Sequence, residues 1–131
     1  MIWRPDFHFI EQRPALVHGY HRSLCLWSRI NRCTPDTPGV VFALDQGGSC
    51  EGIVYKIAAD QVKAIFPPLW EREMPSGAYN PIWIDCDVGL TKPISALAFV
   101  INPQNDAYIP NMPIEQLCQV IRTAQGINGA C

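Results

Sequence analysis

The chain has 131 residues, of which 48% are apolar and 17% are charged, and its formal net charge is −2. This length suits one domain, residues 1–131, and the apolar content is typical of a folded protein. The sequence contains no basic cluster and no apolar run of about 20 residues, which argues against nucleic-acid and membrane partners. Because the N-terminus also lacks the apolar region of a signal peptide, we expect a cytoplasmic protein.

The six cysteines form no Cys-x-x-Cys pair, and no histidine lies at metal-ligand spacing. An even count allows three disulfides, but without a secretory signal we expect reduced thiols and no metal site. Cys25, Cys86 and Cys118 lie in apolar patterns and are predicted to be buried. His18 and His21 lie near Cys25 in sequence, but nothing nearby supplies the third group that would orient a Cys–His nucleophile.

The first half of the chain alternates short β-like runs with turns. Residues 1–14 predict a loop, residues 15–20 and 23–28 predict strands, and residues 33–39 predict a turn-rich loop. Strands follow at 40–44 and 51–57, with a turn at 45–48 between them. This succession of strand, turn and strand favours antiparallel pairing.

The second half changes period. Apolar residues recur at helical spacing at Val62, Ile65, Phe66, Leu69 and Trp70. Pro67 and Pro68 interrupt this pattern and predict a break near Phe66, followed by a second short helix that carries Glu71 and Glu73. Strands are predicted at 81–88 and 93–101, and Pro113 opens a final helix. The sum predicts an α+β domain with a mostly antiparallel sheet, in the form of a barrel.

Residues 69–79 concentrate two carboxylates, an arginine and aromatic residues. A carboxylate among apolar neighbours can serve as a general base near neutral pH. Glu71 and Glu73 point roughly 200° apart on a helix, so one of them faces solvent. Glu73 adjoins the loop at 74–79 and is the better pocket candidate. By charge pattern alone, a solvated helix end with Arg72 as a surface charge remains the favoured interpretation.

Several stretches keep the order of a known family across almost the whole chain. They are 3–7 (Trp-Arg-Pro-Asp-Phe), 17–22 (Val-His-Gly-Tyr-His-Arg), 24–28, 34–35, 38–39, 44–45, 47–52, 69–79, 99–103 and 123–126. The pattern Leu-Trp-x-Arg-Glu-Met-x-x-Gly-x-Tyr at 69–79 is the most specific of them. On these residues the chain resembles the ChaC-type γ-glutamylcyclotransferases, which act on glutathione.

The resemblance implies a small mixed, mostly antiparallel β-barrel with flanking helices. It also implies a lyase that converts glutathione to 5-oxoproline and Cys-Gly by intramolecular aminolysis, with no metal and no cofactor. The acid/base glutamate of the family matches Glu73, and the tyrosine that borders the pocket matches Tyr79. We expect Trp3 and Arg72 to join Tyr79 as substrate-binding residues.

One departure from the family pattern concerns the N-terminus. The family opens with a strand and a Tyr-Gly-Ser-Leu loop whose backbone N–H groups hold the γ-glutamyl group, and Met1 falls on the leucine of that loop. We therefore expect a barrel without the first family strand, and little activity from residues 1–131 alone. A homodimer is expected to fill the gap, in preference to residues 1–11. The alternatives are an inactive relative with a binding or structural role, and a cyclotransferase for another γ-glutamyl amine.

Overall fold

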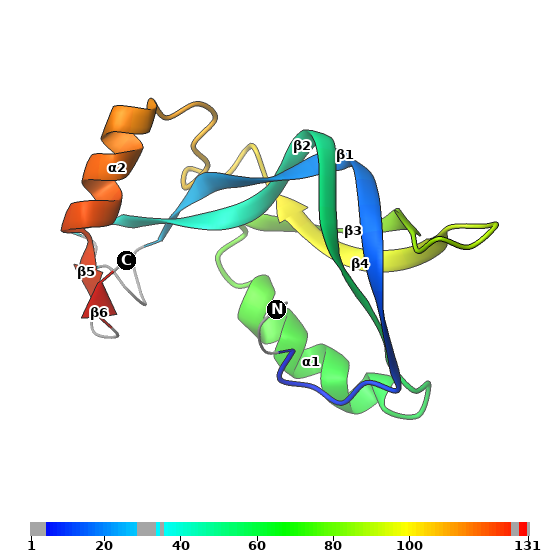
Figure 1. Cartoon of the computed structure of the whole chain (residues 1–131). Helices are drawn as coiled ribbons and strands as arrows, with labels where there is room; N and C mark the ends of the chain where they lie inside the picture. The colour runs from blue at the N-terminus through cyan, green and yellow to red at the C-terminus, as the bar shows by residue number, and fades with distance from the viewer. Residues whose placement is uncertain (1–4, 29–33, 35, 127–128, 131) are drawn as a thin grey trace.

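Four antiparallel strands form the main sheet of the computed structural model, in the order β2-β1-β3-β4. The structure describes residues 5–28, 34, 36–126 and 129–130. In chain order the elements are β1 (Glu11–Ser28), β2 (Gly39–Lys56), α1 (Val62–Glu73), β3 (Tyr79–Asp87), β4 (Ile94–Ile101), α2 (Ile114–Thr123), β5 (Gln125–Gly126) and β6 (Gly129–Ala130). Figure 1 shows β1 and β2 as a long bent pair that runs from the region of α1 to the region of α2.

Each of these two strands joins two of the short runs predicted from the sequence into one strand about three times as long as either run. β1 and β2 have 18 residues each, and their pairing is irregular at two points, of which only the first coincides with a predicted turn, at 45–48. At the first bend, Gly19 lies opposite Gly47 and Gly48, and all three have positive φ angles of 84°, 96° and 67°. At the second bend, Cys25 is an extra residue between the pairs Leu24–Phe42 and Leu26–Val41. The turn signal at 45–48 therefore marks a β-bulge rather than the end of a strand.

The predicted helix break at Phe66 is wrong, because α1 continues through Pro67 and Pro68 to Glu73. The two prolines remove the N–H groups that would bond to the carbonyls of Lys63 and Ala64. Both of those residues are exposed, so solvent can satisfy the carbonyls. The helix has no buried residue and lies at the surface, which makes the loss of two helical hydrogen bonds tolerable.

The predicted α+β fold with an antiparallel sheet is confirmed, with one correction: the sheet is not closed into a barrel among the described residues. β2 and β4 stand at opposite ends of the strand order, yet they approach each other in space. β1 pairs with β3 only at Leu16–Asp87 and Val17–Cys86. The sheet thus curls partway round a hollow that its side chains leave open.

Small buried clusters take the place of one large core. Cys25, which is 1% exposed, packs with Leu26, Ala43, Ala78 and Ile101, and a second cluster comprises Ala15, Val17 and Cys86. The burial predicted for Cys25 and Cys86 is confirmed. It is wrong for Cys118, which is exposed on α2. A helical period identifies an apolar face but not whether another element covers it.

Among the described residues, no helix combines the length and the apolar character that crossing a bilayer requires.

Candidate active site

The segment that joins α1 to β3 brings Glu73 and Tyr79 together. Glu73 is the last residue of α1, and the N–H of Met74 closes the helix by donating to the carbonyl of Trp70 at 2.9 Å. The chain then reverses: the N–H of Gly77 donates to the carbonyl of Met74 at 3.1 Å, and Gly77 has φ of 65°. This left-handed conformation favours glycine, which explains its place in the segment. Tyr79 then opens β3.

Two asparagines from the loop after β4 hold this segment. Asn102 donates from its side chain to the carbonyl of Gly77 at 3.0 Å, and its backbone N–H donates to the carbonyl of Ala78 at 2.8 Å. Asn105 donates from its side chain to the carbonyl of Ser76 at 3.0 Å. Carbonyls that no helix or strand ladder satisfies thus find side-chain donors. The position of Glu73 relative to Tyr79 is fixed by this clamp.

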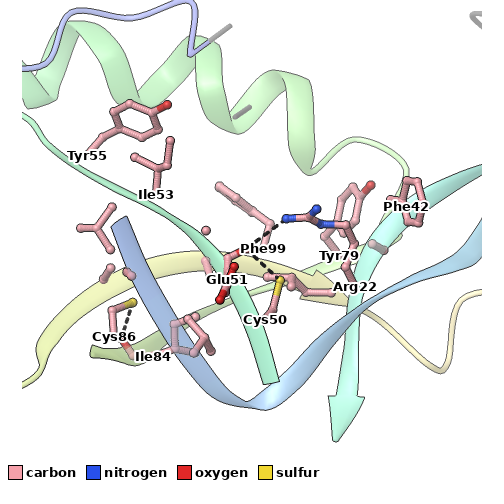
Figure 2. A pocket seen from close by; sticks show the side chains of 18 of the residues that line it. Arg22, Phe42, Cys50, Glu51, Ile53, Tyr55, Tyr79, Ile84, Cys86 and Phe99 are labelled. Atoms are coloured by element: carbon pink, nitrogen blue, oxygen red, sulfur yellow. Dashed lines mark hydrogen bonds between the residues drawn. The ribbon is translucent and has the colours of Figure 1, made fainter. Parts of the chain in front are cut away.

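Glu73 and Tyr79 line one cavity of about 370 Å³. Figure 2 shows it with α1 on one side and the strands of the sheet on the other. The walls come from all four strands of the main sheet and the end of α1. The lining residues include Arg22, Phe42, Cys50, Glu51, Ile53, Tyr55, Ile84, Cys86, Ala96 and Phe99. The hollow is therefore mainly apolar, with a few charged and hydroxyl groups at its wall.

The Glu73 carboxylate is shielded but not fully occupied. Its side chain is 17% exposed, whereas Glu71, two residues earlier on the same helix, is exposed, as the helical geometry predicts. The Nε of Arg72 donates to Oε1 of Glu73 at 3.0 Å. Within the described part of the chain, Oε2 of Glu73 accepts no hydrogen bond. One carboxylate oxygen is thus free to exchange a proton with a molecule in the cavity.

Arg72 is held by two carboxylates. Besides Glu73, it contacts Oδ2 of Asp6 through Nη1 at 3.5 Å, and its side chain is 41% exposed. Arg72 does not line the cavity. It connects the N-terminal segment to the end of α1 and stands behind the Glu73 carboxylate.

Tyr79 presents a neutral phenol to the cavity. Burial raises the pKa of Tyr79 above its ordinary value, and the electrostatic influence of Glu73 and, less strongly, of Cys25 raises it further. The phenol therefore keeps its proton across the neutral pH range and can donate a hydrogen bond.

Aromatic residues outside the cavity pack against two of its lining residues, Phe99 and Tyr55. Trp70 on α1 meets Phe99 of β4 edge-on, with ring centroids 6.4 Å apart. Phe7 and Phe9 pack against Tyr55 of β2, with centroids 5.7 and 4.9 Å away. These two rings belong to residues 1–11, the segment considered as the alternative to a homodimer for filling the gap. Trp3, the other aromatic residue predicted at the site, lies outside the described residues.

Sequence reasoning assigned no role to Arg22, Cys50 or Glu51, although all three line the cavity. They fall inside the stretches 17–22 and 47–52 that carry the family resemblance, which was the available signal. The pairing of β1 with β2 brings them to the wall of the cavity that Glu73 also lines, which the sequence does not show.

Comparison with known proteins now adds a family. The sequence model of the ChaC-like protein family matches residues 1–131. The chain belongs to the ChaC-like protein family. Among its relatives, the glutathione-specific gamma-glutamylcyclotransferase of Escherichia coli is 29% identical over 126 residues, which cover 96% of this chain and 54% of that protein. Human glutathione-specific gamma-glutamylcyclotransferase 1 is 30% identical over 133 residues, covering 98% of this chain and 60% of that protein.

The ChaC-like chain also shares its fold with a solved structure. A yeast gamma-glutamylcyclotransferase specific to glutathione superposes with a TM-score of 0.85 at 17% identity, covering 98% of this chain and 77% of that one. At this identity the likeness shows the fold. The ChaC-like chain spans between half and two thirds of the length of the bacterial and human relatives.

Proposed function

We propose that this ChaC-like chain is a γ-glutamylcyclotransferase that converts glutathione to 5-oxoproline and Cys-Gly. The observation that carries the proposal is the Glu73 carboxylate, shielded at the end of α1, with one free oxygen and with Tyr79 on the wall of the same cavity. The names of the bacterial and human relatives support glutathione as the substrate.

The reaction needs no water and no other reactant. The α-amine of the substrate attacks its own γ-carbonyl carbon, which forms a C–N bond and closes a five-membered lactam. The amide bond between that carbon and the cysteine nitrogen then breaks. Protons leave the attacking nitrogen and reach the departing nitrogen, so that 5-oxoproline and Cys-Gly together contain every atom of glutathione. A single carboxylate can perform both proton transfers in turn.

Each site residue has a distinct proposed role in this reaction. Glu73 accepts the proton of the α-amine at Oε2 and returns it to the leaving nitrogen. Tyr79 borders the reacting group and donates a hydrogen bond from its neutral phenol, which can stabilise negative charge on the γ-carbonyl oxygen. Trp3 and Arg72 complete the proposed substrate-binding set, and Arg72 acts through its hydrogen bond to Glu73 rather than by pairing with a substrate carboxylate. The cavity walls favour the folded, cyclising shape of the substrate over extended ones.

Two further properties belong to the proposal. The four described cysteines, Cys25, Cys50, Cys86 and Cys118, have free thiols, which supports a reducing compartment such as the cytoplasm. A homodimer is proposed because β2 and β4 each offer an edge of the main sheet to a second copy.

The test is product formation from glutathione, with 5-oxoproline and Cys-Gly measured separately. Residues 1–131 are compared with the same residues preceded by the opening strand and Tyr-Gly-Ser segment of the family. The proposal expects equal amounts of both products from the longer form and little from residues 1–131 alone. Turnover by residues 1–131 alone would overturn the expectation about the Tyr-Gly-Ser segment. Absence of 5-oxoproline from both forms would refute the activity and favour a binding or structural role.

A further inference from the structure

The charges of the cavity wall are unevenly distributed. Its lining residues include two carboxylates, Glu51 and Glu73, and one cation, Arg22. A γ-glutamyl peptide such as glutathione carries two carboxylates and one ammonium group at neutral pH. The ammonium group finds a partner in either glutamate, whereas a carboxylate that enters this cavity meets a single positive charge on the wall. An anionic group without such a partner would be strongly disfavoured in a mainly apolar hollow.

Arg22 is an exposed residue at the cavity wall, and its single hydrogen bond to the described residues leaves most of its donors available. It lies on β1 between the two bends and pairs with Leu44 of β2. The Nη2 of Arg22 donates to the backbone carbonyl of Glu51 at 3.1 Å, a contact that Figure 2 marks with a dashed line. Within the described residues this is its one hydrogen bond, and no carboxylate lies within 4 Å of its guanidinium. Four of the five N–H donors of the guanidinium thus remain for a ligand.

Arg72 is the other arginine that could bind a substrate carboxylate, but it differs from Arg22 in already having carboxylate partners. Its guanidinium already contacts the carboxylates of Asp6 and Glu73, and it stands outside the lining of the cavity. A substrate carboxylate at Arg72 would have to displace one of those partners. Arg22 binds a carboxylate without losing any ion pair, and its planar fork allows two parallel hydrogen bonds.

We propose that Arg22 binds a carboxylate of the γ-glutamyl substrate in the cavity that contains Glu73. This inference rests on the proposed function for the identity of the substrate. It does not depend on turnover, because it concerns binding. Either the α-carboxylate of the glutamyl group or the carboxylate of the terminal glycine supplies the same chemistry, and two analogues distinguish them.

The test measures the dissociation constant of glutathione by calorimetry, in the Glu73→Gln background so that the ligand is not consumed. Both the 131-residue chain and the form with the family's opening segment are titrated. Arg22→Met removes the charge, and Arg22→Lys keeps the charge but loses the paired geometry. Arg13→Met is the matched control, because Arg13 is on the same strand, pairs with Glu11 and does not line this cavity. Urea unfolding establishes that each variant is folded.

A charge-assisted pair of this kind predicts a dissociation constant raised about 10- to 100-fold in Arg22→Met, with a smaller rise in Arg22→Lys and none in Arg13→Met. The same series is repeated with glutathione glycinamide and with 4-aminobutanoyl-Cys-Gly, each of which lacks one carboxylate. The analogue without the contacted carboxylate should bind the parent and Arg22→Met equally.

A folded Arg22→Met variant that binds glutathione as tightly as the parent overturns the inference. So does a fold-change that persists with both analogues, or the absence of glutathione binding in both forms. The activity is judged separately: if binding depends on Arg22 but no 5-oxoproline forms in the chain with native Glu73, the inference stands and the proposed function fails.

Discussion

Gly77 offers a quantitative test of how the segment between Glu73 and Tyr79 is built. Its φ of 65° places it in the left-handed region, and a Cβ added there would lie 3.6 Å from Nδ2 of Asn105. That distance is an ordinary van der Waals contact. Substitution by alanine therefore introduces backbone strain but no clash, and its effect can be worked out from the backbone alone.

Left-handed backbone costs an ordinary residue about 1–2 kcal/mol. Alanine offsets about 0.4–1 kcal/mol of this by restricting the unfolded chain. The Gly77→Ala variant should therefore lose about 1 kcal/mol of unfolding free energy. With a urea m-value of about 1.5 kcal/mol/M, the midpoint falls by roughly 0.7 M.

Gly52→Ala is the matched control, since Gly52 lies in β2 without a left-handed φ and an added Cβ meets nothing within 4 Å. Its midpoint should stay level or rise, because only the unfolded chain is affected. Urea unfolding followed by tryptophan fluorescence measures both. If the urea midpoint of Gly77→Ala equals or exceeds that of the parent chain, Gly77 does not hold the left-handed conformation described. The hydrogen bonds of Asn102 and Asn105 to this segment would then be in doubt as well.

Two other outcomes follow from the structure. Burial raises the pKa of Cys25, Cys86, Tyr79 and Tyr108, so the unfolded chain loses these protons first as pH rises, and the free energy of unfolding should fall above about pH 9. Urea midpoints at about pH 8 and about pH 10.5 measure this loss of stability, and Tyr108→Phe should make the difference between the two midpoints smaller. A midpoint at about pH 10.5 equal to or above that at about pH 8 would contradict the prediction. For the proposed homodimer, sedimentation of residues 1–131 at micromolar concentration should give twice the monomer mass, and a clean monomer would refute it.

Most of the strands could be predicted because the alternation of apolar and polar residues and the positions of turn residues are local features of the sequence. Gly47 and Gly48 predict a turn between two strands, although together with Gly19 they form a bulge within one continuous pair of strands. A glycine with positive φ serves both purposes, and only the pairing of β1 with β2 decides between them. The prolines of α1 predict a helix break that does not occur. The cost of a missing N–H depends on whether solvent reaches the carbonyl left without its helical partner, and the sequence does not show this.

Part of the site could also be predicted. The helical angle predicts that one of Glu71 and Glu73 faces solvent, and the neighbouring loop at 74–79 favours Glu73 as the pocket residue. In the structure Glu73 lines the cavity and Glu71 is exposed. The catalytic role of Glu73 stays a prediction, as do those of Tyr79, Trp3 and Arg72. The sequence does not predict a role for Arg22. Its proposed role depends on the absence of a carboxylate partner among the described residues, which only the three-dimensional packing determines.

The proposed role of Glu73 in moving the protons of the cyclisation can be tested by removing its carboxylate. The initial rate of 5-oxoproline release from glutathione is compared for the parent, Glu73→Gln and Glu71→Gln, each preceded by the family's opening strand and Tyr-Gly-Ser segment. Glutamine keeps the shape of the side chain and removes the base, so the rate should fall about 10²-fold or more in Glu73→Gln, while Glu71→Gln keeps the parental rate. Near-parental turnover by a folded Glu73→Gln variant would contradict the account.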